Sequence, residues 1–130
     1  MDLQGLNTKE RAAQGIDIVI REPAAPFAKT DITIRVLGRD SSEYQNALRG
    51  VLKRQFGTEP DGEGGAIEVL AAVTLGWENV AYEGKAVEYS ADNVGWLYRE
   101  FPWIREQVEA AVKDRSRFFG ERSNGSATQS

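Results

Sequence analysis

Apolar and polar side chains alternate, with a period of two, along two stretches near the N-terminus. These stretches are GIDIVIR at residues 15–21 and DITIRVLG at residues 31–38. The alternation and the many β-branched residues predict two strands, each with one buried face. Residues 22–30 between them contain two prolines and are too long for a tight turn. We expect an antiparallel hairpin with helices over one face, because two strands alone are marginally stable.

The pattern changes to helical spacing over residues 41–56. The apolar stripe of this segment consists of Tyr44, Leu48, Val51 and Leu52. Asp40 or Ser41 can cap the start of the helix. Arg49, Lys53 and Arg54 lie off the stripe and form a basic face. This face is a candidate contact for an acidic partner, and a solvated helix surface is the alternative.

The middle of the chain combines a glycine-rich stretch with a strongly apolar one. Residues 57–65, GTEPDGEGG, lack the ligand spacing of a calcium loop and the lysine of a phosphate-binding loop. We interpret them as a flexible connector. Residues 66–77, AIEVLAAVTLGW, are apolar nearly all round. This predicts a helix that is buried on several sides at the centre of the fold and ends at Gly76.

The last third of the chain contains one short hairpin signal and two helix signals. Residues 80–89, VAYEGKAVEY, are typical of a small hairpin or an ordered loop. Ser90 is a good N-cap for a helix over residues 91–101. Its buried face is expected to contain Val94, Leu97, Tyr98 and Phe101. Pro102 ends that helix and starts another. The apolar stripe of the second helix contains Ile104, Val108, Ala111, Val112, Phe118 and Phe119.

These elements predict a single domain with two polar ends. Residues 1–14 show no sustained period and are expected to form a mobile N-terminal arm. Residues 15–119 form the globular domain, and residues 120–130 are expected to be a disordered tail. The predicted fold class is α+β and mostly α-helical. It consists of an N-terminal two-stranded antiparallel hairpin covered by about four helices.

Composition narrows the classes of function. The 130-residue chain contains neither cysteine nor histidine, so it lacks thiolate ligands, the commonest general base and the commonest metal ligand. We expect no metal, no cofactor and no enzymatic activity. Residues 57–100 carry nine acidic and two basic side chains, a net charge of −7, which disfavours nucleic acid as a partner. No run of about 18 apolar residues and no signal peptide are present, so no membrane partner is expected.

Aromatic residues suggest where a partner protein would bind. All three tryptophans lie within residues 75–104. Trp96 lies opposite the apolar face of its helix, and Trp103 lies at the edge of the next stripe. Both are candidate interface anchors, because exposed tryptophans are favoured there. The alternative for Trp96 is packing under the central helix or against residues 80–89. Phe118 and Phe119 are further candidates, with core packing as their alternative.

The order of the motifs resembles a known family. VLGRDSSEY precedes a helix, GWENV follows the apolar segment, and EGK forms a turn; YSADNVGWLYREFPWIREQVEAAV and RFF follow. Over about residues 31–119, this order is similar to that of the small tail assembly chaperones of long-tailed, siphovirus-like bacteriophages. The family has no catalytic residues to transfer to this chain. Only Trp77 and the helix start at Ser90 and Asn93 correspond, and we interpret these as structural.

The resemblance implies a binding role in the cytoplasm of a bacterial host. Proteins of this family coat the long, largely helical tape-measure protein and keep it soluble. They help recruit tail-tube subunits and are absent from the finished virion. The resemblance implies the same two partners here, with a homo-oligomer as a further expectation.

Two other classes of function stay open. One is a structural virion protein, such as a tail-completion or head–tail connector subunit. The other is a carboxylate-based enzyme that uses Asp92, Glu88 and Tyr98.

Overall fold

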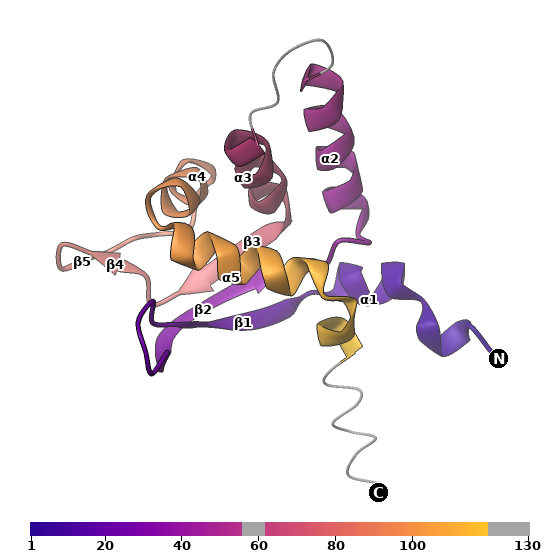
Figure 1. The fold of residues 1–130 in the computed structure, drawn as a ribbon, viewed down its shortest axis with the longest axis horizontal. Helices are drawn as coiled ribbons and strands as arrows, with labels where there is room; N and C mark the ends of the chain where they lie inside the picture. The colour runs from indigo at the N-terminus through magenta and orange to yellow at the C-terminus, as the bar shows by residue number, and fades with distance from the viewer. Residues whose placement is uncertain (56–61, 120–130) are drawn as a thin grey trace, which may run out of the picture.

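The computed structural model of the chain describes residues 1–55 and 62–119, which form an α+β fold (Figure 1). The α-helices of this part are Thr8–Gln14 (α1), Ser42–Gln55 (α2), Gly62–Val73 (α3), Ala91–Glu100 (α4) and Pro102–Lys113 (α5). The strands are Ile16–Arg21 (β1), Lys29–Val36 (β2), Thr74–Glu78 (β3), Ala81–Tyr82 (β4) and Lys85–Ala86 (β5). Short 3₁₀ helices cover Gln4–Leu6 (η1) and Arg115–Phe119 (η2). The prediction of a mostly helical α+β fold with an N-terminal hairpin is confirmed.

The hairpin of β1 and β2 belongs to a three-stranded antiparallel sheet with the order β1-β2-β3. Ile18 pairs with Ile34, and Ile16 pairs with Val36. Because successive side chains of a strand point to opposite faces, this register places the isoleucines and Val36 on one side. Ile18, Ile20, Ile34 and Val36 are buried there, as the alternating pattern predicts.

The third strand corrects the prediction of one helix that continues to Gly76. Helix α3 ends at Val73, and the following residues form β3, which pairs with β2. A short apolar run does not by itself distinguish a buried helix from a buried strand. The carbonyl of Val73 accepts a hydrogen bond from the backbone N–H of Leu37 at 2.9 Å. The last carbonyl of α3 therefore receives a hydrogen bond from the residue that follows β2. The pairing of β3 with β2 extends the predicted hairpin to a three-stranded sheet.

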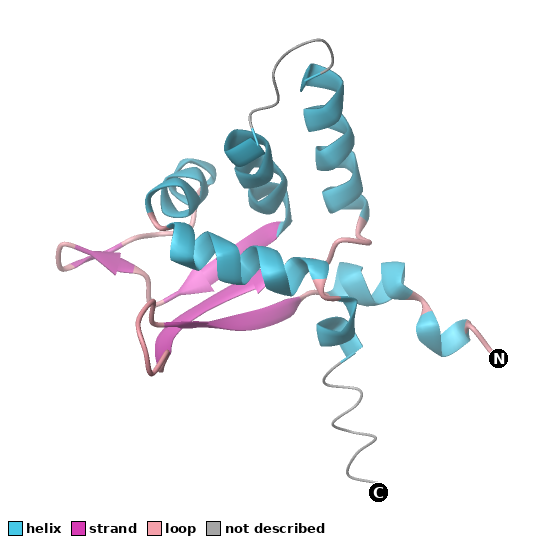
Figure 2. Ribbon diagram, viewed as in Figure 1, coloured by secondary structure: helices cyan, strands magenta, loops and turns pink. Residues whose placement is uncertain are grey.

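Helices α3, α4 and α5 lie over one face of this sheet (Figure 2). The core between the two layers includes Leu70, Val94, Leu97, Tyr98, Ile104, Val108 and Val112. The predicted inner faces of the last two helices are therefore confirmed at these positions. Helix α2 stands outside this layer and packs mainly against α3 (Figure 1).

The first edge of the sheet is contacted by a side chain of α5. The amide oxygen of Gln107 accepts a hydrogen bond from the backbone N–H of Arg21 at 2.8 Å. Its amide nitrogen donates to the carbonyl of Arg21 at 2.9 Å. On the sheet face away from the helices, Val19 and Leu75 are exposed.

The first 14 residues, for which the sequence predicts a mobile arm, contain the helix α1. The side chain of Asn7 accepts a hydrogen bond from the backbone N–H of Glu10 and caps this helix. Ala12 is buried against Gly38, and the carbonyl of Ala12 accepts a hydrogen bond from the backbone N–H of Gly38 at 3.0 Å. Residues 8–14, predicted as part of a mobile arm, therefore form a helix whose Ala12 packs against the turn after β2.

The smaller sequence signals have clear structural counterparts. Strands β4 and β5 form the short hairpin expected from residues 80–89, and Glu83 and Gly84 at its turn both have positive φ. Ser41 caps α2 by accepting a hydrogen bond from the backbone N–H of Tyr44. Ser90 caps α4 in the same way. Pro102 is the first residue of α5.

Three segment predictions differ from the structure or lie, wholly or in part, outside the described residues. The stripe predicted up to Phe119 is divided, because α5 ends at Lys113 and η2 follows. Of the connector predicted at residues 57–65, residues 57–61 lie outside the described part, whereas residues 62–65 form the first turn of α3. The tail predicted at residues 120–130 also lies outside it.

Candidate protein-binding surfaces

Trp96 packs into an aromatic cluster at the β4–β5 hairpin. Its ring makes edge-to-face contacts with Tyr82 and Phe101, each with 5.3 Å between ring centroids. This is the alternative packing against residues 80–89 considered for Trp96. Trp96 is half-buried, and Tyr82 remains 50% exposed beside it. The two rings line an open hollow of about 510 Å³, so this cluster remains a candidate contact surface.

Trp103 lies on another surface, at the start of α5. It is half-buried and lines a hollow of about 420 Å³ together with Phe27 and Gln107. Phe27 belongs to the loop between β1 and β2 and is 53% exposed. Trp96 and Trp103 therefore have different neighbours and do not form one site.

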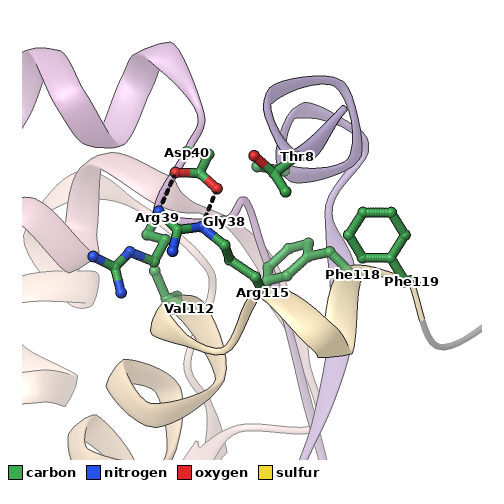
Figure 3. A pocket seen from close by; sticks show the side chains of 9 residues that line it. Thr8, Gly38, Arg39, Asp40, Val112, Arg115, Phe118 and Phe119 are labelled. Carbon is green, nitrogen blue, oxygen red and sulfur yellow. Dashed lines mark hydrogen bonds and ion pairs between the residues drawn. The ribbon is translucent and has the colours of Figure 1, made fainter. Parts of the chain in front are cut away.

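Phe118 and Phe119 lie at the opposite end of α5, against α1 (Figure 3). Phe118 is buried and confirms the expectation that one of the pair packs in the core. A Cβ atom on Gly38 would lie 3.0 Å from the Phe118 ring and 2.9 Å from the Cβ of Ala12. Phe119 is half-buried, and the guanidinium of Arg11 lies 5.4 Å from its ring centroid. This junction is closely packed and offers no open hollow to a partner.

An ion pair closes the same junction. Arg115 donates two hydrogen bonds to the carboxylate of Asp40, from Nε at 2.5 Å and from Nη2 at 2.9 Å (Figure 3). These hydrogen bonds hold the pKa of Asp40 below its usual range, and burial opposes them. A hydrogen bond from Thr8 and the charge of Arg39 add to the lowering of this pKa. The pair joins η2 to the turn before α2, which is a structural role.

A shallow apolar groove lies where α2, α3 and α5 meet. We name it the α2–α3 groove and define it by Tyr44, Leu48, Leu52, Gly65, Ala66 and Lys113. Its volume is about 210 Å³, below the range of roughly 300 to 1,000 Å³ that is usual for small-molecule pockets. Leu52 lines the α2 side of the groove and is 57% exposed. Leu52, a residue of the predicted apolar stripe, therefore stays exposed at the open rim of the groove, whereas Val51 of the same stripe is buried.

The two basic candidates lie on α2 beside this groove. Arg49 and Lys53 are exposed, and neither forms an ion pair with a described residue. Arg49 donates a hydrogen bond to the side chain of Asn46. In contrast, Arg54 forms an ion pair with Glu68 of α3. Of the predicted basic face, Arg54 is therefore neutralised by α3, whereas Arg49 and Lys53 remain exposed. The groove was not predictable from the sequence, because Gly65 and Ala66 leave open space only once α2 lies against them.

Trp77 has a structural place in β3. Its Nε1 donates a hydrogen bond to the carbonyl of Val87 at 2.8 Å, and its ring packs edge-to-face on Tyr89. The hydroxyl of Tyr89 donates to the carbonyl of Thr74 at 2.6 Å. These contacts attach the segment after the β4–β5 hairpin to the sheet.

The residues considered for carboxylate catalysis do not share a surface. Tyr98 is completely buried, and burial raises its pKa strongly, whereas Asp92 and Glu88 are exposed. Within residues 1–55 and 62–119, no group of three or more acidic side chains is arranged to hold a metal ion. Over the same residues, no helix combines the length and apolar character needed to cross a membrane.

A scan against protein-family models found no match, and searches of curated proteins and of solved structures found none either.

Proposed function

We propose that this protein is a non-enzymatic tail assembly chaperone of a siphovirus-like phage. In the bacterial host cytoplasm it binds the tape-measure protein and helps recruit tail-tube subunits. Support comes from the order of motifs over residues 31–119 and from the places of these motifs in the fold. Gly38 fits against Ala12, Trp77 holds the segment after the small hairpin, and Ser90 caps α4. These three residues help to hold the fold together, as expected for a family whose shared motifs are structural and not catalytic.

The observation that carries the proposal is the incomplete covering of α2. This helix packs mainly against α3 and leaves Leu52 57% exposed at the rim of the α2–α3 groove. A chaperone for a long amphipathic helix needs open apolar surface of this kind, because the helix must bury its own apolar stripe. Arg49 and Lys53 on the same helix, which form no ion pair with a described residue, add a polar border to that surface.

Co-expression with the tape-measure reading frame of the same genome tests the proposal. We expect the tape-measure protein to become soluble and to co-purify with the tagged chain. A tape-measure variant with serine at its apolar stripe positions serves as the control and should not be captured. Failure of the natural tape-measure protein to co-purify or to gain solubility would contradict the proposal.

The composition of purified virions separates the chaperone from a structural virion protein. A chaperone is expected to be absent from mature particles, so mass spectrometry should detect tail-tube subunits without this chain. A copy number similar to that of a tail or connector protein would support the structural alternative instead.

If the protein were a carboxylate-based enzyme, Asp92→Ala would abolish an activity and leave folding nearly intact. This residue lies in the first turn of α4, where a negative charge contributes roughly 0.3 to 1 kcal/mol. We expect Asp92→Ala to lower the free energy of unfolding by that amount and to leave tape-measure capture intact.

A further inference from the structure

We infer that the α2–α3 groove binds an amphipathic helix whose apolar stripe is flanked by acidic residues on the side that faces Arg49 and Lys53. This inference rests on the proposed function and names the surface that receives the client and the charge pattern the client carries. The hollows beside Trp96 and Trp103 offer aromatic contacts but no comparable charge pattern. The groove combines open apolar surface with a row of cations.

The geometry of α2 places the apolar and basic rows side by side. Residues four apart in a helix lie one above the other on the same face. Leu48 and Leu52 therefore form one row, and Arg49 and Lys53 form the adjacent row. The opposite flank of α2 faces α3, where Val51 is buried and Arg54 pairs with Glu68. The basic row thus borders the open side of the groove.

The charges around the groove make the open rim positive. Arg49 and Lys53 form no ion pair with a described residue. On the far wall, the ammonium of Lys113 pairs with Glu109 at 3.1 Å, so these charges offset each other. A client with acidic residues along one flank of its stripe would complement the unpaired cations and orient itself by them.

The dimensions of the groove favour a helix over a small molecule. Its volume of about 210 Å³ is too small to enclose a drug-sized ligand. Gly65 and Ala66 line its wall on α3 and Leu52 lines its rim on α2, so apolar side chains of an incoming helix can enter between them. Binding of this kind uses apolar positions at i, i+3, i+4 and i+7 of the partner.

Synthetic helical peptides test the inference without the tape-measure protein. One peptide of about 20 residues carries leucines at helical spacing with glutamates on one flank. A matched peptide carries lysines instead of the glutamates, and a scrambled peptide has no stripe. Fluorescence anisotropy of the labelled peptides, at low and high salt, measures binding to the full chain. We expect the glutamate-flanked peptide to bind best and to weaken as salt rises.

Variants of exposed residues separate the apolar contribution from the charge contribution. Leu52→Ser should weaken binding of both striped peptides about tenfold, as expected for an apolar anchor. Reversal of the basic row by Arg49→Glu with Lys53→Glu should switch the preference to the lysine-flanked peptide. Matched controls are Leu75→Ser on the sheet and Lys9→Glu with Arg99→Glu, which alter exposed residues elsewhere. These controls should leave both affinities unchanged.

The outcomes distinguish this inference from the proposed function. No binding of either striped peptide, equal binding by Leu52→Ser, or an unchanged charge preference in the reversed variant would overturn the groove as the site. Capture of the tape-measure protein by all groove variants would also overturn it, while the chaperone function would stand. If the peptides bind with the predicted preferences but the tape-measure protein is not captured, the groove is supported as a helix-binding site and the chaperone function is contradicted.

Discussion

The hydroxyl of Tyr98 donates a hydrogen bond to Oγ1 of Thr74 across 2.7 Å. The direction follows from Thr74, whose single hydroxyl hydrogen is donated to the carbonyl of Leu70, also at 2.7 Å. Tyr98 and Thr74 are both buried. This chain of hydrogen bonds links α4 to the point at which α3 ends and β3 begins.

Replacement of Thr74 by valine should lower the free energy of unfolding by about 1 to 3 kcal/mol. Valine has nearly the same shape but leaves the buried hydroxyl of Tyr98 without a partner. Adding Tyr98→Phe should recover part of the loss, because it removes the unpaired donor. Urea denaturation of the single and double variants measures this coupling. A double variant whose loss equals the sum of the single losses would show that the two side chains do not interact.

The buried hydroxyl also predicts a loss of stability in alkali. Burial raises the pKa of Tyr98 above its ordinary value of 10.0. The folded protein therefore holds this proton more tightly than the unfolded chain does. The resulting stabilisation is complete below about pH 10 and declines as the pH rises further. Urea midpoints above about pH 10 should fall less steeply in Tyr98→Phe than in the wild type, whereas Tyr82→Phe should follow the wild type.

The ion pair between Asp40 and Arg115 predicts the opposite dependence in acid. Hydrogen bonds from Arg115 lower the pKa of Asp40 from its ordinary value of 3.8, so the folded protein releases this proton more readily than the unfolded chain does. The stabilisation is present above about pH 4 and is lost as the pH falls through the lowered pKa. Asp40→Asn should reduce stability at neutral pH and flatten this acid limb in urea titrations. Asp31→Asn, at an exposed carboxylate without an ion pair among the described residues, should retain the limb.

Two glycine substitutions should change stability in opposite directions. Gly38→Ala places a methyl group within 3.0 Å of Ala12 and of Phe118 and should cost about 1 to 3 kcal/mol by overpacking. Gly95→Ala, in the middle of α4, would meet only the Arg99 side chain at 3.7 Å. It should stabilise the helix by roughly 0.5 to 1 kcal/mol. Thermal unfolding of both variants measures the difference, and equal effects would argue against the close packing at Gly38.

Local patterns predicted the elements that depend on nearby residues. The alternation at Ile18 and Ile34 identified both strands of the hairpin, and Ser90 and Pro102 marked the starts of the last two helices. Each of these signals depends only on residues within one turn or one strand, so the local sequence is enough to predict the element. Val94 is buried as its spacing predicts, whereas Trp96, predicted on the opposite side of α4, is half-buried because its ring packs against Tyr82 and Phe101.

The features missed by sequence analysis depend on contacts between distant segments. Residues from Thr74 onward form a strand because β2 offers them an edge, and Ala12 is buried because Gly38 leaves room for it. The exposure of Leu52 depends on how α2 packs, mainly against α3, in the described part of the chain. The six residues expected to contact a partner lie on several separate surfaces, which periodicity along single helices does not reveal.

The paired hydrogen bonds between Gln107 and Arg21 limit how this protein can associate with other copies. An open strand edge is a template on which another chain can add a strand, which leads to aggregation. Here a side-chain amide occupies both backbone groups of Arg21 on the outer strand. An incoming strand would have to displace Gln107 before it could pair at this position. Growth of the sheet from β1 is thereby opposed at this position. The contact reduces self-association through β1 in a protein that also exposes apolar helix surface.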